Sequence, residues 1–486
     1  MEHFDVLIVG AGVSGLGAAC HLRRQCPDRS FVILDDNKSF GGTWHTHRFP
    51  GIRSDSDLYT YGYRFKPWIG PPIATAPKIL AYLAEAVEEN GLAKHIRYQH
   101  RVTEASWSSD RNLWMITSTR SNDGDVEHFS AGFLFMCQGY YRHAQGYTPV
   151  WPGMDDFTGL ILHPQTWPED LDCTGKNIVV IGSGATAATI IPALAKQCDH
   201  VTMLQRSPTY YFSGTNTLPI ADELRGLGID ETWIHEIARR KFLRDDADFM
   251  DRIRIEPDKV AEELIADVRS RLGENYDVDT HFRPNYRPWQ QRLAFVPDGD
   301  LLETIRTGRA SVTTGEIERF TASGIKLKSG AVLAADIIVT ATGLELCSFG
   351  DIAFAIDGKP IKLADAVSYH GIMLADVPNL AWIFGYIRSS WTLRVDLVCD
   401  VVCRILNHMA EQGLQRVEPR LRPEDRSMMI GPWVEPDNFN PNYIARGAHL
   451  LPKRGSKPEW QHSHDYWVDK DRLPSLSPDD TVLFYS

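Results

Sequence analysis

The stretch DVLIVGAGVSGLGAACHLRRQCPDRSFVILD, residues 5–35, determines how the fold begins. An apolar, β-rich run at residues 5–9 leads into the glycine cluster 10–15. A segment with helical periodicity follows to Arg24, and a second apolar run ends at Asp35. A strand, a tight turn, a helix and a second strand in this order predict the opening unit of a dinucleotide-binding fold.

The glycine cluster in this stretch has the spacing GxGxxG. In such a unit Gly10 permits the tight turn, Gly12 lets the backbone approach a pyrophosphate, and Gly15 allows the helix to pack closely on the strand. The helix N-terminus adds free N–H donors and a partial positive charge for phosphates. Asp35 stands where a carboxylate accepts hydrogen bonds from ribose hydroxyls, so the unit is predicted to bind a dinucleotide.

The same pattern returns in the middle of the chain. Residues 177–181 form an apolar run and residues 201–205 form the next one. Between them lies a second cluster, GxGxxA, with the candidate binding residues Gly182, Ser183, Gly184, Ala185, Thr186 and Ala187. Arg206 and Ser207 follow where the first unit has its acid, and a guanidinium with a hydroxyl suits a 2′-phosphate. The first site is therefore predicted to bind FAD and the second NADPH. The alternative is that Arg206 is a solvated surface arginine.

The repeat predicts an α/β fold with two Rossmann-like, three-layer dinucleotide-binding domains and a helical insertion in the second. Residues 214–289 are rich in charged helix formers and show no strand pattern, which is typical of such an insertion. We expect the FAD-binding domain to consist of residues 1–145 and 376–486. The NADP-binding domain is expected to consist of residues 146–213 and 290–375, with the insertion between its two parts.

Composition narrows the class of protein further. The 486 residues carry a net charge of −12 and no Lys/Arg run, which argues against a nucleic-acid partner. The eight cysteines form no CxxC pair, so we expect reduced thiols and no metal site. The uncharged stretch 178–195 contains glycines and Pro192 and divides into strand, turn and helix rather than a membrane span. The N-terminus lacks a signal-peptide pattern, which predicts a cytoplasmic protein; the oligomeric state stays open.

A segment between the two predicted domains resembles a family fingerprint. Residues 157–168, FTGLILHPQTWP, match FxGxxxHxxxWP at every fixed position, and residues 41–55 match GGxWxxxxxPGxxxD. Both patterns are those of flavin-dependent Baeyer–Villiger monooxygenases, and the chain is most similar to their ethionamide-activating subgroup. Related N- and S-oxidising flavin monooxygenases usually have Tyr-Lys where Trp167-Pro168 stand here.

The resemblance implies a reaction. FAD is reduced by NADPH, O2 then forms an anionic peroxyflavin, and this attacks a ketone carbonyl to give an ester or lactone, with sulfides as further substrates. The resemblance gives Arg292 the role of stabilising the negative charge and Asp55 that of holding this arginine. A fixed cation beside developing oxyanion charge lowers the barrier. Many family members have Lys before the arginine; here it is Gln291, which weakens the NADPH preference.

The resemblance also assigns further residues of this sequence to the two cofactors. Ser14 is similar to the pyrophosphate-turn residue, and Val102 to the strand end that meets adenine. Thr43 and Trp44 match the flavin-facing loop, while Arg53 and Ser54, together with Asp55, match residues that touch the nicotinamide half of NADP.

The residues leave other functions open. An oxygenase acting on N or S atoms needs the same two cofactors. A flavin disulfide reductase needs a redox cysteine pair after the first glycine cluster, and Cys20 and Cys26 have the wrong spacing. A sensor that binds NADPH without turnover is the non-enzymatic alternative. His163 can act as a base or position the linker, and we favour positioning. Trp391 can line a substrate pocket or belong to the core.

Overall fold

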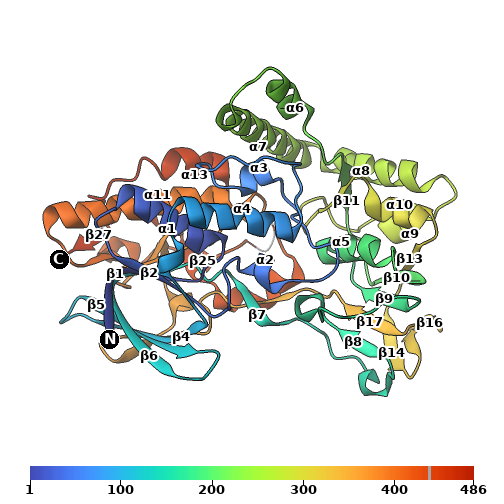
Figure 1. Ribbon diagram of the computed structural model, residues 1–486, viewed down its shortest axis with the longest axis horizontal. Coiled ribbons are helices and arrows are strands. Elements are labelled where there is room, and N and C mark those ends of the chain that lie inside the picture. The colour runs from blue at the N-terminus through green and yellow to red at the C-terminus, as the bar shows by residue number, and fades with distance from the viewer. Residues whose placement is uncertain (436–438) are drawn as a thin grey trace.

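The computed structural model describes residues 1–435 and 439–486, which form two α/β lobes side by side (Figure 1). The first lobe contains a mixed sheet of order β20-β19-β4-β5-β6-β1-β2-β3. Its strands are β1 (Glu2–Val9), β2 (Phe31–Asp35), β3 (Ile96–Tyr98), β4 (His100–Ser108), β5 (Leu113–Arg120), β6 (Val126–Met136), β19 (Ala353–Ile356) and β20 (Lys359–Ile361). Strands β21 (Ser368–Tyr369), β22 (Met373–Leu374) and β23 (Leu380–Trp382) extend it beside β6.

The centre of this sheet is a parallel Rossmann-like unit. Strand β1 pairs in parallel with β2 and with β6, with Val6 opposite Phe31 and Phe133. Its residues 6–9 are buried on both faces, as expected for a parallel strand covered by helices. One face is covered by α1 (Val13–Gln25), α4 (Ala76–Glu89) and α11 (Trp391–Gln412), whose apolar sides share one buried cluster with the sheet.

The remaining elements of the first lobe lie around this core. They are the short helices α2 (Thr43–Thr46), α3 (Leu58–Tyr61), α12 (Asn442–Gly447) and α13 (Tyr466–Arg472), and the strands β24 (Val417–Pro419), β25 (Ile430–Pro432), β26 (Lys453–Gly455) and β27 (Leu483–Tyr485). Strand β24 pairs with β27 and β25 with β26, so the C-terminal segment folds back on the first lobe.

The second lobe has a parallel sheet of order β13-β10-β9-β17-β8. Its strands are β8 (Leu160–Leu162), β9 (Asn177–Ile181), β10 (His200–Gln205), β13 (Ala310–Thr314) and β17 (Ile337–Thr340), and α5 (Ala185–Leu194) and α10 (Asp300–Arg306) pack on it. A separate antiparallel sheet contains β14 (Ile317–Thr321), β15 (Gly324–Leu327) and β16 (Val332–Ala334). The two parallel units explain the repeat in the sequence, and the prediction of two Rossmann-like domains is confirmed.

A helical segment is inserted in the second lobe between two paired strands, β11 (Tyr211–Gly214) and β12 (Ala294–Pro297). Its helices are α6 (Pro219–Gly226), α7 (Glu231–Ile255), α8 (Pro257–Leu272) and α9 (Val278–Phe282). Figure 1 shows α6 and α7 above the lobes, with α7 next to α3 of the first lobe. This segment is the one for which the sequence predicts a helical insertion.

The chain crosses between the lobes through two short strands, β7 (Tyr141–Gly146) and β18 (Leu344–Leu346), which pair with each other. The first crossing lies at the expected boundary near residue 145. The second lies earlier than the expected return at 376, because β19 already pairs with β4 of the first sheet. A strand of four residues carries too little periodicity to be recognised from sequence.

The expectations about the cysteines and about a membrane span can be compared with the described part of the chain. There, every cysteine is a free thiol, and no group of His, Cys, Asp and Glu side chains is arranged to hold a metal ion. None of the described helices has the length and apolar character needed to cross a membrane.

A buried histidine ties α1 to α11 and gives a prediction about stability. His21 Nε2 lies 3.0 Å from Asp396 Oδ1 and its Nδ1 3.1 Å from Asp400 Oδ1. Burial disfavours the charged imidazolium, but the hydrogen bonds to both carboxylates outweigh it and raise the pKa of His21 from 6.5 to about 9. Because the folded-state pKa is the higher one, the stabilisation is complete below pH 6.5 and is lost as pH rises through about 9.

We therefore expect the free energy of unfolding to fall by up to about 3 kcal/mol as pH rises across this window. Urea unfolding of the wild type and of His21→Gln, from about pH 6 to pH 10, measures the effect. The variant should lose this pH dependence, and an identical slope in both proteins would contradict the charged state assigned to His21.

Candidate active site

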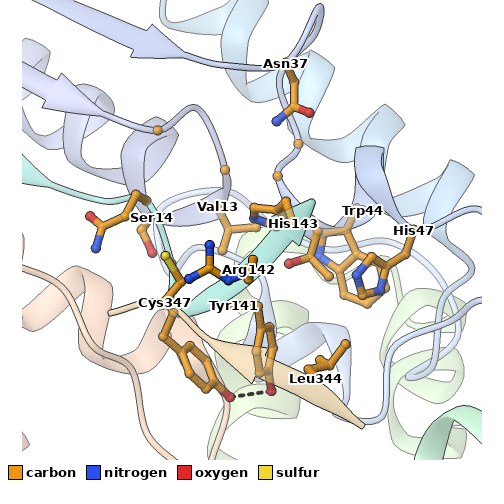
Figure 2. A pocket seen from close by; sticks show the side chains of 18 of the residues that line it. Val13, Ser14, Asn37, Trp44, His47, Tyr141, Arg142, His143, Leu344 and Cys347 are labelled. Carbon is orange, nitrogen blue, oxygen red and sulfur yellow. Dashed lines mark hydrogen bonds between the residues drawn. The ribbon is translucent and has the colours of Figure 1, made fainter. Parts of the chain in front are cut away.

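A cavity of about 420 Å³ runs between the two lobes. Its wall is made by the N-terminus of α1, the loop into α2, the segment around residues 52–55, the crossing strand β7, the N-terminus of α5 and the start of α11. Figure 2 shows side chains from the N-terminus of α1, from α2 and from β7 around one space. The predicted site residues that line it are Gly10, Gly12, Ser14, Asp35, Thr43, Trp44, Arg53, Asp55, Val102, Ala185, Thr186 and Arg292.

The first glycine cluster has the geometry that a phosphate site needs. Gly10 has φ +99°, and a Cβ there would lie 2.8 Å from the Cys137 carbonyl oxygen. A Cβ on Gly15 would lie 1.8 Å from the Gly10 carbonyl oxygen, so this glycine lets α1 pack against the turn and does not line the cavity. Gly12 caps α1 without a side chain, which leaves the first N–H groups of the helix facing the cavity. These features fit a dinucleotide pyrophosphate.

Asp35 is buried at the end of β2 and orders the glycine turn. Its Oδ2 accepts a hydrogen bond from Ala11 N at 2.6 Å and its Oδ1 accepts one from Asn37 N at 2.8 Å. Each carboxylate oxygen can accept more than one hydrogen bond, and Asp35 also lines the cavity, so a ribose hydroxyl can still be bound there.

The loop before α2 places Trp44 against the same cavity. Gly42, at φ +54°, begins α2, and Trp44 Nε1 donates a hydrogen bond to the Tyr61 hydroxyl at 2.7 Å. Thr43 lines the cavity beside it, and Val102 lines it from β4. Trp44 is thereby fixed in orientation, as a residue that contacts a planar ring must be.

Arg292 and Asp55 form an ion pair in this cavity. Arg292 Nη2 lies 3.0 Å from Asp55 Oδ2, and both side chains are more than one third exposed, at 36% and 39%. The negative charge of Asp55 raises the pKa of Arg292 above its ordinary value, with burial opposing and Tyr443 adding to the effect. The two residues are 237 positions apart in the sequence, and the fold places a permanent, oriented cation where both lobes meet.

The neighbours of Asp55 have separate partners. Arg53 forms two hydrogen bonds to the Asp300 carboxylate, at 2.5 and 3.1 Å, and so connects this loop to α10 of the second lobe. Ser54 is buried, away from the cavity lining, and its backbone N donates to the Ala74 carbonyl oxygen at 2.9 Å. The contact of Arg53 and Ser54 with NADP stays a prediction, and in this structure both residues position Asp55.

The second glycine cluster repeats the geometry of the first. Gly182 has φ +129°, and a Cβ there would lie 2.3 Å from the Ala341 carbonyl oxygen, while a Cβ on Gly184 would meet nothing within 4 Å. Gly184 caps α5, and Ala187 is fully buried in the role of Gly15. The Ser183 hydroxyl lies 2.9 Å from that of Thr209. The open N-terminus of α5 fits a second dinucleotide.

Arg206 and Ser207 lie exposed beyond the end of β10, outside the residues that line the cavity. The Ser207 carbonyl oxygen accepts a hydrogen bond from Ser183 Oγ at 3.3 Å, which places this pair beside the second glycine cluster. The location is that of the adenosine end of a dinucleotide in a Rossmann-like unit.

The fingerprint segment forms β8 at the edge of the second-lobe sheet and the turn after it, which contacts the connection between the lobes. Gln165 N donates to His163 Nδ1 at 3.1 Å, and His163 Nε2 donates to the Gly343 carbonyl oxygen at 3.0 Å. Burial lowers the pKa of His163, so the imidazole is neutral at pH 7. Both ring nitrogens are engaged by backbone groups, which supports the positioning role for His163 rather than a role as a base.

Several residues of the cavity wall were not predicted from the sequence. Tyr61, Tyr140 and Tyr141 line it, and Trp391, for which two roles were open, lines it too. No motif marks the tyrosines; the available signal was that residues 140 and 141 follow directly on Cys137-Gln138-Gly139, at the end of a buried strand. Ligands of such folds bind at the carboxyl ends of the strands.

Two Rossmann-like lobes, each with an open helix N-terminus behind a glycine turn, share a cavity that contains an arginine–carboxylate pair. This arrangement defines a two-dinucleotide oxidoreductase of the flavoprotein type.

Comparison with known proteins agrees with this class. Residues 8–68 match a family model described as an NAD(P)-binding Rossmann-like domain, and residues 70–218 match one described as flavin-binding monooxygenase-like. The chain is 47% identical over its full length to 97% of the FAD-containing monooxygenase EthA of Mycolicibacterium smegmatis. It is 42% identical, over 99% of its length and 96% of the relative, to the probable FAD-binding monooxygenase AlmA of an Acinetobacter species.

Solved structures share the fold. An oxidized steroid monooxygenase bound to NADP superposes with a TM-score of 0.78 at 21% identity, covering 99% of both chains. An open form of cyclohexanone monooxygenase superposes with a TM-score of 0.71 at 22% identity, covering 87% of this chain and 91% of the other.

The chain belongs to the FAD-containing monooxygenase family. The predictions of a flavoprotein monooxygenase and of FAD as its cofactor are thereby confirmed, and the match to an NAD(P)-binding family model agrees with the predicted nicotinamide cofactor. The individual contacts to these cofactors were predicted from sequence and stay predictions.

Proposed function

We propose that this protein is a Baeyer–Villiger monooxygenase, which inserts one oxygen atom of O2 next to a ketone carbonyl to give an ester or lactone. The observation that carries the proposal is the Arg292–Asp55 ion pair, 3.0 Å long, in the cavity shared by both glycine clusters. The FxGxxxHxxxWP segment of the second lobe, which contacts the connection between the lobes through His163, supports it. FAD, reduced by NADPH, supplies the chemistry that activates O2.

The residues of the chain divide the remaining tasks. The α1 N-terminus with Gly10, Gly12 and Ser14, together with Asp35, Thr43, Trp44 and Val102, would hold FAD. The α5 N-terminus with residues 182–187, together with Arg206 and Ser207, would hold NADPH. Arg292 stays charged beside Asp55 and stabilises negative charge that develops on oxygen. Because a guanidinium does not lose its proton near neutral pH, Arg292 acts as an electrostatic group and not as an acid.

A second candidate function is oxidation of sulfur or nitrogen atoms, which is equally consistent with the match to the flavin-binding monooxygenase-like family. This reaction uses the same two cofactors but creates no tetrahedral oxyanion on carbon. It therefore makes no comparable demand on the Arg292–Asp55 pair, and we rank it second.

Product analysis tests the proposal. Purified holoenzyme is incubated with NADPH, air and separate linear, cyclic and aryl ketones and alkyl aryl sulfides, and products are identified by gas chromatography and mass spectrometry. We expect esters or lactones from at least one ketone class. Sulfoxides without any ester or lactone would replace the proposal by the second candidate.

A further inference from the structure

We propose that the Tyr141 hydroxyl is a second hydrogen-bond donor to the substrate carbonyl oxygen, next to Arg292, with Tyr140 and Trp391 as the residues that position it. The inference rests on the proposed function and says which end of the cavity binds the carbonyl oxygen of the substrate. The supporting observation is that two tyrosine hydroxyls in the cavity wall are hydrogen-bonded to each other.

Tyr140 and Tyr141 are hydrogen-bonded to each other through their side chains. Their hydroxyl oxygens lie 2.6 Å apart, with ring centroids 4.1 Å apart (Figure 2). Adjacent residues on a regular strand point to opposite faces, so two neighbouring tyrosines in contact require the irregular backbone at the start of β7. In a pair of phenols one proton forms the mutual bond, and the second proton is left for another acceptor.

Tyr140 is fixed from its other side. Its ring stacks on that of Trp391, with centroids 5.1 Å apart and planes within 7°. Trp391 Nε1 in turn donates a hydrogen bond to Ser14 Oγ at 2.8 Å, at the N-terminus of α1. Gly385 makes room for the indole, because a Cβ there would lie 2.3 Å from it. Tyr140 is therefore the anchored member of the pair, with its hydroxyl directed to Tyr141.

Tyr141 is the member of the pair that begins the crossing strand β7. It lines the cavity together with Arg292 and Asp55, and the charges of both act on its phenol. Burial raises the pKa of Tyr141 above its ordinary value, so the hydroxyl keeps its proton at neutral pH. When Tyr140 donates to Tyr141, the remaining proton belongs to the Tyr141 hydroxyl, which lines the cavity with Arg292.

A phenol and a guanidinium at one end of a cavity suit a carbonyl oxygen. When a nucleophilic oxygen adds to a ketone, the electron pair of the C=O bond moves to its oxygen, which becomes negative. Fixed donors aimed at that atom stabilise the adduct more than the ketone, which is how an oxyanion site accelerates a reaction. Tyr141 donates without transferring its proton, so no change in its protonation state is required.

Infrared spectroscopy of a bound ketone tests the contact without turnover. Oxidised holoenzyme with NADP⁺ is loaded with carbonyl-¹³C-labelled 2-octanone, and the carbonyl stretch is compared between wild type, Tyr141→Phe, Tyr140→Phe and the remote control Tyr485→Phe. A hydrogen bond to the oxygen lowers the stretching frequency. We expect Tyr141→Phe to move the band toward that of the free ketone, Tyr140→Phe to broaden it, and the control to match wild type.

Turnover gives the second readout. Tyr141→Phe should lower kcat for ester formation about tenfold or more, with a much smaller change in KM, while NADPH oxidation continues with release of hydrogen peroxide. An unchanged carbonyl band with an unchanged ester yield in Tyr141→Phe would overturn the inference. Failure of the wild type to form any ester would instead overturn the proposed function, so the two failures are distinguishable.

Discussion

Replacement of Arg292 by alanine should abolish ester formation while FAD is still reduced by NADPH. The guanidinium is the cation that the fold pairs with Asp55 in the cavity, whereas the predicted contacts to the FAD pyrophosphate come from the first glycine cluster. Loss of a single oxyanion donor in other enzymes costs about 3 kcal/mol, and loss of a charged one should cost at least as much, or about 100-fold or more in rate. The reason is that the remaining carboxylate of Asp55 would then repel the developing negative charge.

Stopped-flow absorbance at the flavin band under anaerobic conditions measures reduction, and chromatography of aerated reactions measures ester. Arg292→Lys serves as the charge-preserving comparison and should be impaired less, since an ammonium keeps the charge but not the two-point geometry. Arg254→Ala, an exposed arginine on α7, is the matched control. Ester formation by Arg292→Ala at more than one tenth of the wild-type rate would show that the assignment of Arg292 is wrong.

The fold was accessible from sequence because its decisive residues act locally. Gly10 and Gly182 are needed for turns with positive φ, and the apolar runs before them are continuous because parallel strands are buried on both faces. Each of these constraints acts within a segment of about thirty residues, so it can be recognised in the sequence of that segment. Together they specify two similar units and their order in the chain, but not how the two units are oriented relative to each other.

The site was only partly accessible for the same reason. Arg292 and Asp55 were found through family motifs, and no local rule relates residues so far apart in the chain. The tyrosines that line the cavity were not predicted, and the role of Trp391 stayed open, because Tyr140 and Trp391 become neighbours only after α11 packs on the first lobe. The contact of Arg53 with Asp300 joins the two lobes, and no periodicity encodes it; the contact of Arg53 with NADP stays a prediction.

Arg206→Ala should weaken the enzyme's use of NADPH and leave its use of NADH nearly unchanged. The 2′-phosphate is the group that distinguishes the two cofactors, and the exposed guanidinium at the end of β10 stands where an acid would otherwise meet the ribose. A hydrogen bond to a charged group contributes about 1.5–3 kcal/mol, so KM for NADPH should rise about 10- to 100-fold. Steady-state NADPH and NADH oxidation with a saturating ketone measures both constants.

The surroundings of Arg206 sharpen this test. The charge of Arg206 helps to lower the pKa of Glu316, after the larger effect of Lys328, which lies 2.5 Å from that carboxylate. A bound 2′-phosphate would compete with Glu316 for the guanidinium, so Glu316→Gln should lower KM for NADPH, the opposite direction from Arg206→Ala. Arg309→Ala, an exposed arginine just before β13, should change neither constant. Equal effects of Arg206→Ala on NADPH and NADH would mean that Arg206 contacts a part of the cofactor common to both, and the 2′-phosphate would then need another partner.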